Sequence, residues 1–224
     1  HLLPGMRMVV NPQHRQELAD FWEIPIDKIK PTPGRSIIEM VEGLHSGDVR
    51  ALWIVSANPA ASLPDTKWVR QGLAKAELLI VQDIFHPTES SMMADVVLAG
   101  AHWFEMTGTF ISSERRIELV DGIVEPYGNV KPDYDIICRV AQAMGFKNDF
   151  QFSSSEEVFE ELKKITKGRI CDMNGVTYER LRKNIGPQLP CSTEDHPGTE
   201  RLFTDRRFPR PDGRAALLPR EYKL

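Results

Sequence analysis

The sequence predicts a three-layer αβα fold with a mainly parallel sheet, followed by a small β-hairpin region and an extended C-terminal tail. Two observations predict this α/β class. Residues 51–55 and 78–81 are continuous apolar runs of strand length, as expected for strands that are covered on both faces. Residues 65–76, between these runs, have helical spacing, so the three segments form a βαβ unit with parallel strands.

The composition argues against several broad classes of protein. The chain has 224 residues, of which 41% are hydrophobic and 27% are charged, values typical of globular proteins. Its formal net charge of −4 argues against a general nucleic-acid-binding protein, which carries a basic face. No run of about 18 apolar residues is present, and residues 1–5 do not resemble a signal peptide. We therefore expect neither a nucleic acid nor a membrane as a partner.

The cysteines predict no metal framework. Cys138, Cys171 and Cys191 are scattered, and none belongs to a CxxC pair of the kind that binds zinc or an iron–sulfur cluster. Isolated thiols in odd number fit a reducing compartment better than a disulfide scaffold. We therefore expect a cytoplasmic location.

The first part of the chain is expected to hold a helix, a linker and then the start of the α/β domain. Asn11 caps a short helix that extends to residue 22, and three prolines make residues 24–34 a loop. Residues 1–35 are therefore an N-terminal helix and linker. Apolar residues at helical spacing over 37–44 predict the next helix, which Gly47 ends.

The middle of the chain changes from α/β to short strands. After a short helix over 89–94, residues 95–98 are a candidate third strand of the parallel sheet. Three short strands are then predicted, with Asp121-Gly122 as the hairpin turn between the last two: 109–112, 116–120 and 123–125.

Helices are expected again after the hairpin. Asp133 begins a helix that Gly145 ends, and further helices are predicted over 155–164 and 178–183. The α/β domain therefore extends over residues 36–185. Residues 186–224 are rich in proline, glycine and charge, which predicts an extended connecting tail with little means of burying itself.

Polar side chains follow the two strands of the βαβ unit. Asn58 comes after the first strand, and Gln82 and Asp83 come after the second. Ligands of open α/β sheets bind beyond the carboxyl ends of parallel strands, so these side chains are expected at one edge. A carboxylate there can accept both adjacent N–H groups of guanine, and the amide of Asn58 can donate and accept. In the alternative interpretation, Asp83 caps the following segment and Asn58-Pro59 only turns the chain.

No catalytic residue and no metal ligand is predicted on this chain. The arginines of Glu114-Arg-Arg could bind phosphates, although a solvated charge cluster is commoner. The histidines are dispersed, and His86, His102 and His196 adjoin no carboxylate motif. The sequence contains no GxSxG, P-loop, HExxH or GxGxxG motif.

An ordered set of motifs resembles the molybdopterin oxidoreductases of the dimethyl-sulfoxide-reductase superfamily. Each motif is weak alone, but their order and spacing agree over essentially the whole chain. The matching stretches are 52–65, 81–90, 94–98, 108–116, 189–191, 196–199 and 208–214. The loop Asn-Pro-Ala-x-Ser-Leu-Pro-Asp of residues 58–65 is most similar to that of assimilatory nitrate reductase, and formate dehydrogenase alpha subunits share nearly all the other motifs.

The resemblance implies a role in cofactor binding. In this superfamily the corresponding region binds one of two molybdopterin guanine dinucleotides that carry molybdenum. The motif positions that contact this cofactor correspond to Asn58, Gln82, Asp83 and Asp133. The resemblance also places Met106 where periplasmic relatives carry a lysine, so the contact of that lysine is not carried over to this chain. The usual Leu-Pro at the end of the third strand is Leu98-Ala99 here.

The resemblance also implies that the chain is an internal portion of a longer enzyme. Such enzymes carry a 4Fe-4S cluster, the molybdenum ligand and a C-terminal barrel-like domain, none of which is recognisable on this chain. Its partners would be the remaining domains of the parent enzyme and an electron-donor protein or domain. The expected reaction of the parent is reduction of nitrate to nitrite, and the isolated chain is expected to be inactive.

Alternatives to the nitrate reductase interpretation remain open at this point. One alternative is that the parent is a formate dehydrogenase. Another is that the chain is a stand-alone α/β interaction module that lacks catalytic groups. A third alternative is an independent α/β protein that binds guanine nucleotides.

Overall fold

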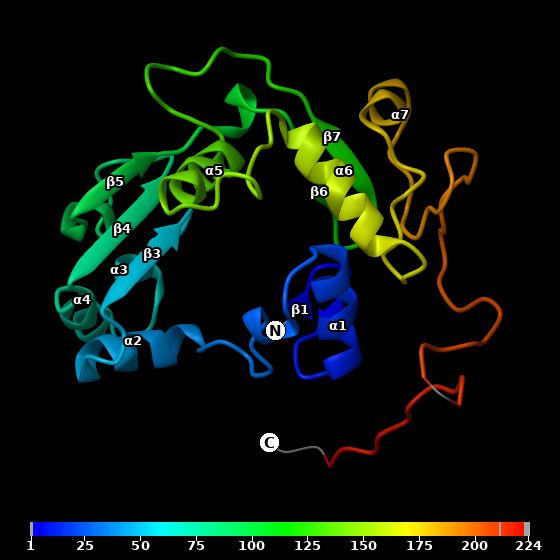
Figure 1. Cartoon of the computed structure of the whole chain (residues 1–224), viewed down its shortest axis with the longest axis horizontal. Coiled ribbons are helices and arrows are strands. Elements are labelled where there is room, and N and C mark those ends of the chain that lie inside the picture. The colour runs from blue at the N-terminus through cyan, green and yellow to red at the C-terminus, as the bar shows by residue number, and fades with distance from the viewer. Residues whose placement is uncertain (1, 211, 222–224) are drawn as a thin grey trace.

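The elements of the chain form two groups. A computed structural model describes residues 2–210 and 212–221. One group contains the parallel sheet with its helices, and the other contains a β-hairpin, the N-terminal helix and two later helices (Figure 1). Within the described residues, no helix is long and apolar enough to cross a membrane.

The sheet of the first group has three parallel strands in the order β3, β4, β5. These strands are β3 (Ala51–Val55), β4 (Leu78–Asp83) and β5 (Val96–Ala99). The register pairs Val55 with Gln82 and Asp83 with Ala99. The predicted βαβ unit and third strand are thus confirmed, and all three strands end at the same edge.

Helices cover one face of this sheet and buried apolar side chains join the two layers. The helices are α2 (Ile37–Ser46), α3 (Pro59–Ser62) and α4 (Thr66–Leu73). Ser36 and Glu39 form a capping box at the start of α2, and Gly47 ends it at φ 86°, which favours glycine. The shared core consists of Val41, Leu44, Ile54, Ala60, Val69, Leu73, Leu79 and Val81.

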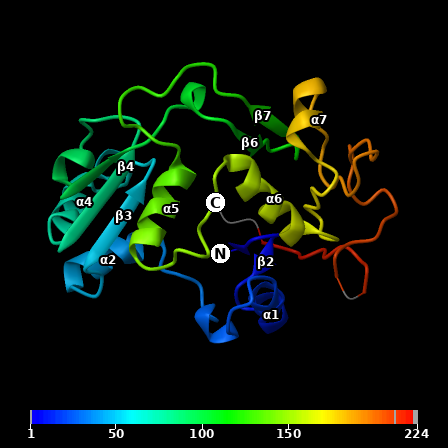
Figure 2. The same ribbon diagram turned by 45° about the horizontal axis from the view of Figure 1, so that its top comes forward.

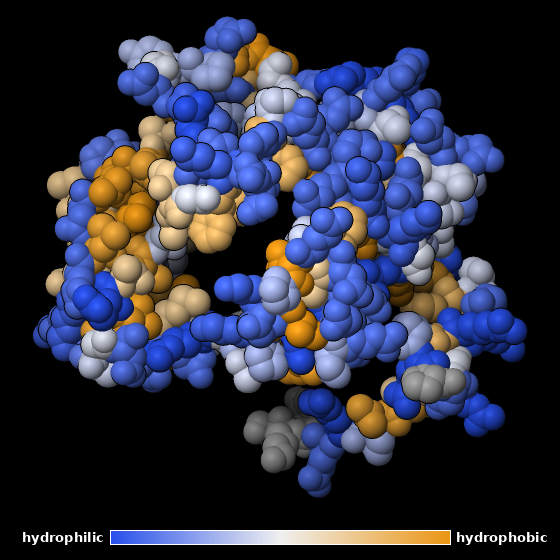
Figure 3. Space-filling model, in the orientation of Figure 1, coloured by the Kyte–Doolittle hydropathy of each residue, from blue (hydrophilic) through white to orange (hydrophobic). Residues whose placement is uncertain are grey.

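Helix α5 (Asp133–Ala143) lies on the opposite side of the sheet from α4 (Figure 2). The three layers predicted from the sequence are therefore present. This second face is only partly covered, because Val55, Leu78 and Val96 remain 41%, 39% and 41% exposed. Figure 3 shows hydrophobic side chains at the surface of this group and an opening between the two groups.

The second group has its own core. Its elements are β1 (Leu2–Leu3), β2 (Arg7–Met8), α1 (Pro12–Phe21), β6 (Gly108–Ile111), β7 (Ile117–Val120), α6 (Ser155–Thr166) and α7 (Tyr178–Lys183). Short 3-10 turns occupy Ile26–Lys28, Ser91–Met93 and Trp103–Glu105. The core consists of Ile117, Phe159, Met173, Val176, Tyr178, Leu181, Leu189 and Cys191.

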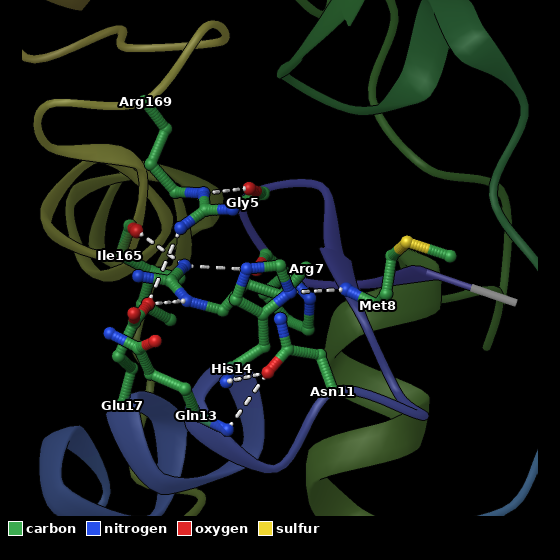
Figure 4. Close-up of polar contacts among 10 residues, drawn as sticks. Gly5, Arg7, Met8, Asn11, Gln13, His14, Glu17, Ile165 and Arg169 are labelled. Carbon is green, nitrogen blue, oxygen red and sulfur yellow. Dashed lines mark hydrogen bonds and ion pairs between the residues drawn. The ribbon is translucent and has the colours of Figure 1, made fainter. Parts of the chain in front are cut away.

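Arg7 joins the N-terminal segment to α6 through a partly buried network (Figure 4). Its guanidinium donates to the carboxylate of Glu17 at 2.8 Å and to the carbonyl of Ile165 at 2.8 Å. Arg169 donates to the same carboxylate at 3.3 Å and to the carbonyl of Gly5 at 2.5 Å. Two arginines and one carboxylate thus connect segments that are distant in the sequence.

The predicted hairpin turn at Asp121-Gly122 is wrong. Strands β6 and β7 pair antiparallel, and the chain reverses between Ser112 and Arg116. Arg115 adopts φ 67° in this turn. The carboxylate of Asp121 instead accepts two hydrogen bonds from Arg182, both at 2.9 Å. The chain does not turn back after β7, and residues 123–125 form no strand.

The prediction that residues 186–224 have little means of burying themselves is wrong for the first part of this segment. Leu189 and Cys191 are 3% and 0% exposed and belong to the second core. Arg116 donates to the carbonyl of Gly186 at 2.7 Å, and Arg115 donates to those of Leu189 and Thr199. These long-range contacts hold in place a proline-rich segment that forms little regular secondary structure by itself.

Candidate functional site

A pocket of about 450 Å³ lies at the carboxyl ends of the parallel strands. Its walls come from the segments that follow β3, β4 and β5 and from the start of α5. This is the edge at which open α/β sheets bind ligands. The lining residues are Ser56, Ala57, Asn58, Asp83, Ile84, Phe85, Thr88, Ala101, Trp103, Met106 and Asp133.

Two carboxylates line this pocket. Asp83 ends β4, and one of its oxygens accepts the backbone N–H of Phe85 at 3.1 Å. Asp133 is the first residue of α5, and its Oδ1 accepts a hydrogen bond from Gln82 at 2.6 Å. Within the described part of the chain, the second oxygen of each carboxylate has no hydrogen-bond donor. Both can therefore accept hydrogen bonds from a ligand.

Backbone contacts bring the two carboxylates to the same edge. The Gly100 N–H donates to the carbonyl of Asp83 at 3.0 Å, and Gly100 forms a parallel bridge with Lys131, just before α5. A Cβ atom on Gly100 would lie 3.4 Å from Oδ1 of Asp133 and 3.6 Å from the carbonyl carbon of Asp83. These are ordinary van der Waals distances, so Gly100 lies in direct contact with both the start of α5 and the end of β4.

Gln82 belongs to the site but does not line the pocket. Its side chain is 0% exposed, and its Nε2 donates to Asp133. Its Oε1 is buried without a hydrogen-bond partner in the described chain. A donor at 2.6 Å from a carboxylate forms a charge-assisted hydrogen bond, which fixes the orientation of the Asp133 side chain.

Asn58 connects the segments that follow β3 and β4. Its Oδ1 accepts hydrogen bonds from the N–H and the hydroxyl of Ser90, at 3.1 and 2.7 Å. Its Nδ2 donates to the carboxylate of Glu89 at 2.7 Å, which lowers the pKa of Glu89 below its ordinary value. The hydroxyl of Ser90 also accepts the N–H of Ala60 at 3.1 Å. Three of the four hydrogen bonds available to the amide of Asn58 are thus made within the protein.

The polarity of the pocket favours a ligand that donates hydrogen bonds. Two carboxylates line it, and its described lining contains no lysine, arginine or histidine. Met106, which lines the pocket, carries no charge. A phosphate would meet like charge here, whereas N–H and O–H groups would find acceptors. The described lining therefore offers acceptors that can bind a ligand through hydrogen bonds.

Two aromatic residues of the pocket were not predicted from the sequence. Phe85 follows the end of β4, and Trp103 follows the end of β5, and they are 65% and 55% exposed. The same rule that selected Asn58 and Asp83 would have found them, because both occupy segments at the carboxyl ends of parallel strands.

The remaining candidate groups do not line this pocket. The side chains of Arg115 and Arg116 bind backbone carbonyls of the segment 186–200, which explains the cluster as a structural contact. His86 contacts the hydroxyl of Ser91 at 3.0 Å, and His102 caps the turn that contains Trp103. The described residues contain no group of three or more histidine, cysteine or acidic side chains that could hold a metal ion.

Comparison with known proteins shows the family. The family of molybdopterin oxidoreductases matches residues 6–143, more than half of the chain. A nitrate reductase of Synechocystis sp. is 43% identical over 220 residues, covering 96% of this chain and 31% of that protein. The assimilatory nitrate reductase catalytic subunit of Bacillus subtilis is 38% identical over 221 residues, covering 98% of this chain and 31% of that protein.

Other relatives have different activities. The F420-dependent formate dehydrogenase subunit alpha of Methanocaldococcus jannaschii is 37% identical over 224 residues, covering 100% of this chain and 31% of that protein. The solved structure of acetylene hydratase from Pelobacter acetylenicus matches with a TM-score of 0.53 and 22% sequence identity. The match covers 65% of this chain and 20% of that chain, and it shows that the two folds are similar. The chain spans 31% of the length of these curated relatives. By the extent of these matches, the chain belongs to the molybdopterin oxidoreductase family.

Proposed function

We propose that this chain is the portion of a longer nitrate reductase that holds the guanine end of a molybdopterin guanine dinucleotide. The observation that carries the proposal is the pair of carboxylates, Asp83 and Asp133, in a pocket whose described lining carries no cationic side chain. Guanine presents two adjacent N–H donors on one edge, and a single carboxylate can accept both. The ribose hydroxyls supply further donors for the second carboxylate.

The residues present fit this group in three respects. The pocket lies at the carboxyl edge of a parallel sheet, it offers unpaired carboxylate oxygens, and both carboxylates are held by hydrogen bonds from the protein. Adenine presents an acceptor beside its exocyclic amine, so the same carboxylate would repel part of its edge. The pocket therefore favours guanine over adenine.

The cofactor, when bound, supplies the redox chemistry of the molybdenum, while the protein supplies binding and orientation. In this proposal Asp83 and Asp133 hold the guanine end, and Asn58 and Gln82 keep the surrounding segments in place. The metal ligand and a 4Fe-4S cluster would belong to the rest of the enzyme, which would receive electrons from a donor protein or domain. Nitrate would be the substrate and the cytoplasm the location.

The cofactor content of the full-length enzyme tests the proposal. We expect Asp83→Ala to lower the guanine nucleotide released per polypeptide, because the base loses its principal acceptor. Asp27→Ala is a matched control, since Asp27 is exposed in a 3-10 turn outside the site. Wild-type nucleotide content in the Asp83→Ala enzyme would overturn the assignment of this pocket.

Formate oxidation is the second candidate activity of the parent enzyme. The similarity to a formate dehydrogenase subunit, at 37% identity, is only slightly lower than that to the nitrate reductases. Assays of the full-length enzyme with nitrate plus a reduced dye, and with formate plus an oxidised dye, distinguish the two. Turnover of formate alone would replace nitrate with formate in the proposal and leave the role of the pocket unchanged.

A further inference from the structure

Two aromatic side chains of the pocket are more exposed than their apolar surface favours. Phe85 and Trp103 are 65% and 55% exposed. Both line the same pocket as Asp83 and Asp133, and they come from the ends of two adjacent strands. Burial of such rings against a ligand would be favourable, and a purine presents two flat faces for this contact.

The segment that carries Trp103 is held by hydrogen bonds and ring packing within the protein. His102 and Glu105 form a capping box around the 3-10 turn, with the His102 N–H donating to Glu105 at 2.8 Å. Glu105 also accepts the N–H of Tyr127 at 3.1 Å, and these two backbone donors lower the pKa of Glu105. The indole of Trp103 packs at an angle on Phe110, with ring centroids 6.1 Å apart. A ring held in this way loses little conformational freedom on binding.

From this arrangement we infer that Trp103 and Phe85 are base-stacking residues, which contact the faces of the purine whose edge Asp83 and Asp133 bind. This inference rests on the proposed function and adds the residues that set affinity for the base. The aromatic residues and the carboxylates have different roles in this inference. Stacking depends on the face of the base and not on its substituents, whereas the carboxylates recognise the donors on its edge.

Titration of the chain with guanosine and inosine separates these two roles. Inosine lacks the exocyclic amine of guanine but keeps the same ring system. We expect Trp103→Ala and Phe85→Ala each to raise the Kd for both nucleosides by about 10-fold or more, with the ratio of the two Kd values unchanged. Asp83→Asn, in contrast, is expected to change that ratio.

Phe104→Ala is the matched control. Phe104 is the neighbour of Trp103 in the same turn and is also 55% exposed, but it does not line the pocket. Its removal is expected to leave both Kd values within about 2-fold of wild type, a change of less than 0.5 kcal/mol by the relation of Kd to free energy. Circular dichroism of each variant verifies that the fold is kept.

A spectroscopic measurement tests direct contact. Guanosine is expected to quench the tryptophan emission of the wild-type chain, because the stacked indole is Trp103; the other three tryptophans do not line this pocket. Trp103→Phe should retain binding in a calorimeter, since phenylalanine also stacks, but should lose the quenching. A role limited to folding would not give this combination.

The outcomes distinguish the inference from the proposed function. Wild-type affinity in Trp103→Ala and Phe85→Ala, in a chain that still binds guanosine, would overturn the stacking role and leave the proposed function standing. An altered Kd ratio in those variants would also contradict it. If the wild-type chain binds no guanosine, the inference fails, and the guanine nucleotide content of the full-length enzyme decides the proposed function separately.

Discussion

The side-chain amide of Gln82 donates to the carboxylate of Asp133 at 2.6 Å and thereby ties the middle strand of the sheet to the first residue of α5. The two residues are 51 positions apart in the sequence. Asp133 lines the pocket, whereas Gln82 is buried and does not line it. Gln82 therefore orients the carboxylate of Asp133 without contacting the pocket itself.

Replacement of Gln82 by methionine is expected to weaken guanosine binding more than it weakens the fold. The change removes the donor to Asp133, but it also removes the buried Oε1 that has no partner. The loss of stability is therefore expected to stay below about 1 kcal/mol in urea unfolding. A several-fold rise in the guanosine Kd, with little change for Gln142→Met in α5, would support the positioning role. Equal binding in both variants would refute it.

Replacement of Asn58 by alanine is expected to loosen the segments that follow β3 and β4. Three hydrogen bonds to Glu89 and Ser90 are lost, at a cost of about 1 kcal/mol each. Hydrogen exchange measures the effect directly, because the backbone N–H groups of Ser90 and Ala60 both belong to this network. Faster exchange at these two amides is predicted, with unchanged exchange in the hairpin of β6 and β7. Uniformly faster exchange would indicate global destabilisation instead.

Replacement of Arg7 by methionine is expected to detach the N-terminal segment from α6. Arg7 is 8% exposed and bonds to Glu17 and to the carbonyls of Ile165 and Pro4. Loss of these contacts should lower the free energy of unfolding by about 2 kcal/mol or more. Arg139→Met is the comparison, since Arg139 forms an exposed ion pair with Asp135 that contributes less than about 1 kcal/mol. Similar losses in the two variants would contradict the importance of the network.

Asp172 is expected to make the stability of the second group depend on pH. Burial alone would raise its pKa, but hydrogen bonds from Asn174 and the N–H of Gly168 outweigh this effect and lower it. Since the folded-state pKa lies below the unfolded value of about 3.9, the contribution is present above that pH. It is lost as the pH falls through the folded-state pKa.

The variant Asp172→Asn tests this dependence. At pH 7 we expect the free energy of unfolding of this variant to be about 1–3 kcal/mol lower than that of the wild type, because one backbone donor loses its acceptor. The difference between the two proteins should shrink below about pH 4, where the carboxylate of the wild type becomes protonated. A difference that stays constant from pH 7 to pH 3 would show that the ionised form of Asp172 contributes nothing.

The parts of the fold that depend on local signals could be predicted from the sequence. The apolar runs gave β3 and β4, Ser36 gave the start of α2, and Asp133 gave the start of α5. The hairpin turn could not be predicted, because Asp121-Gly122 is a strong local turn signal that the pairing with Arg182 overrides. A pairing across 61 positions leaves no local pattern.

The candidate site shows the same division. Strand ends located Asn58 and Asp83 at one edge, and both line the pocket. The alternation of side chains along a strand would also have separated Gln82 from Asp83, since neighbours in a strand point to opposite faces. The contacts of Asn58 with Glu89 and Ser90 could not be foreseen, because they depend on the path of an irregular loop.

The affinities of the chain for guanosine and adenosine test the central claim most directly. If Asp83 and Asp133 recognise a base by its donors, guanosine should bind at least about 10-fold more tightly than adenosine, because adenine would leave a carboxylate facing an acceptor. Asp83→Asn should reduce that preference. Equal affinity for the two nucleosides, or an unchanged preference in the variant, would contradict the account.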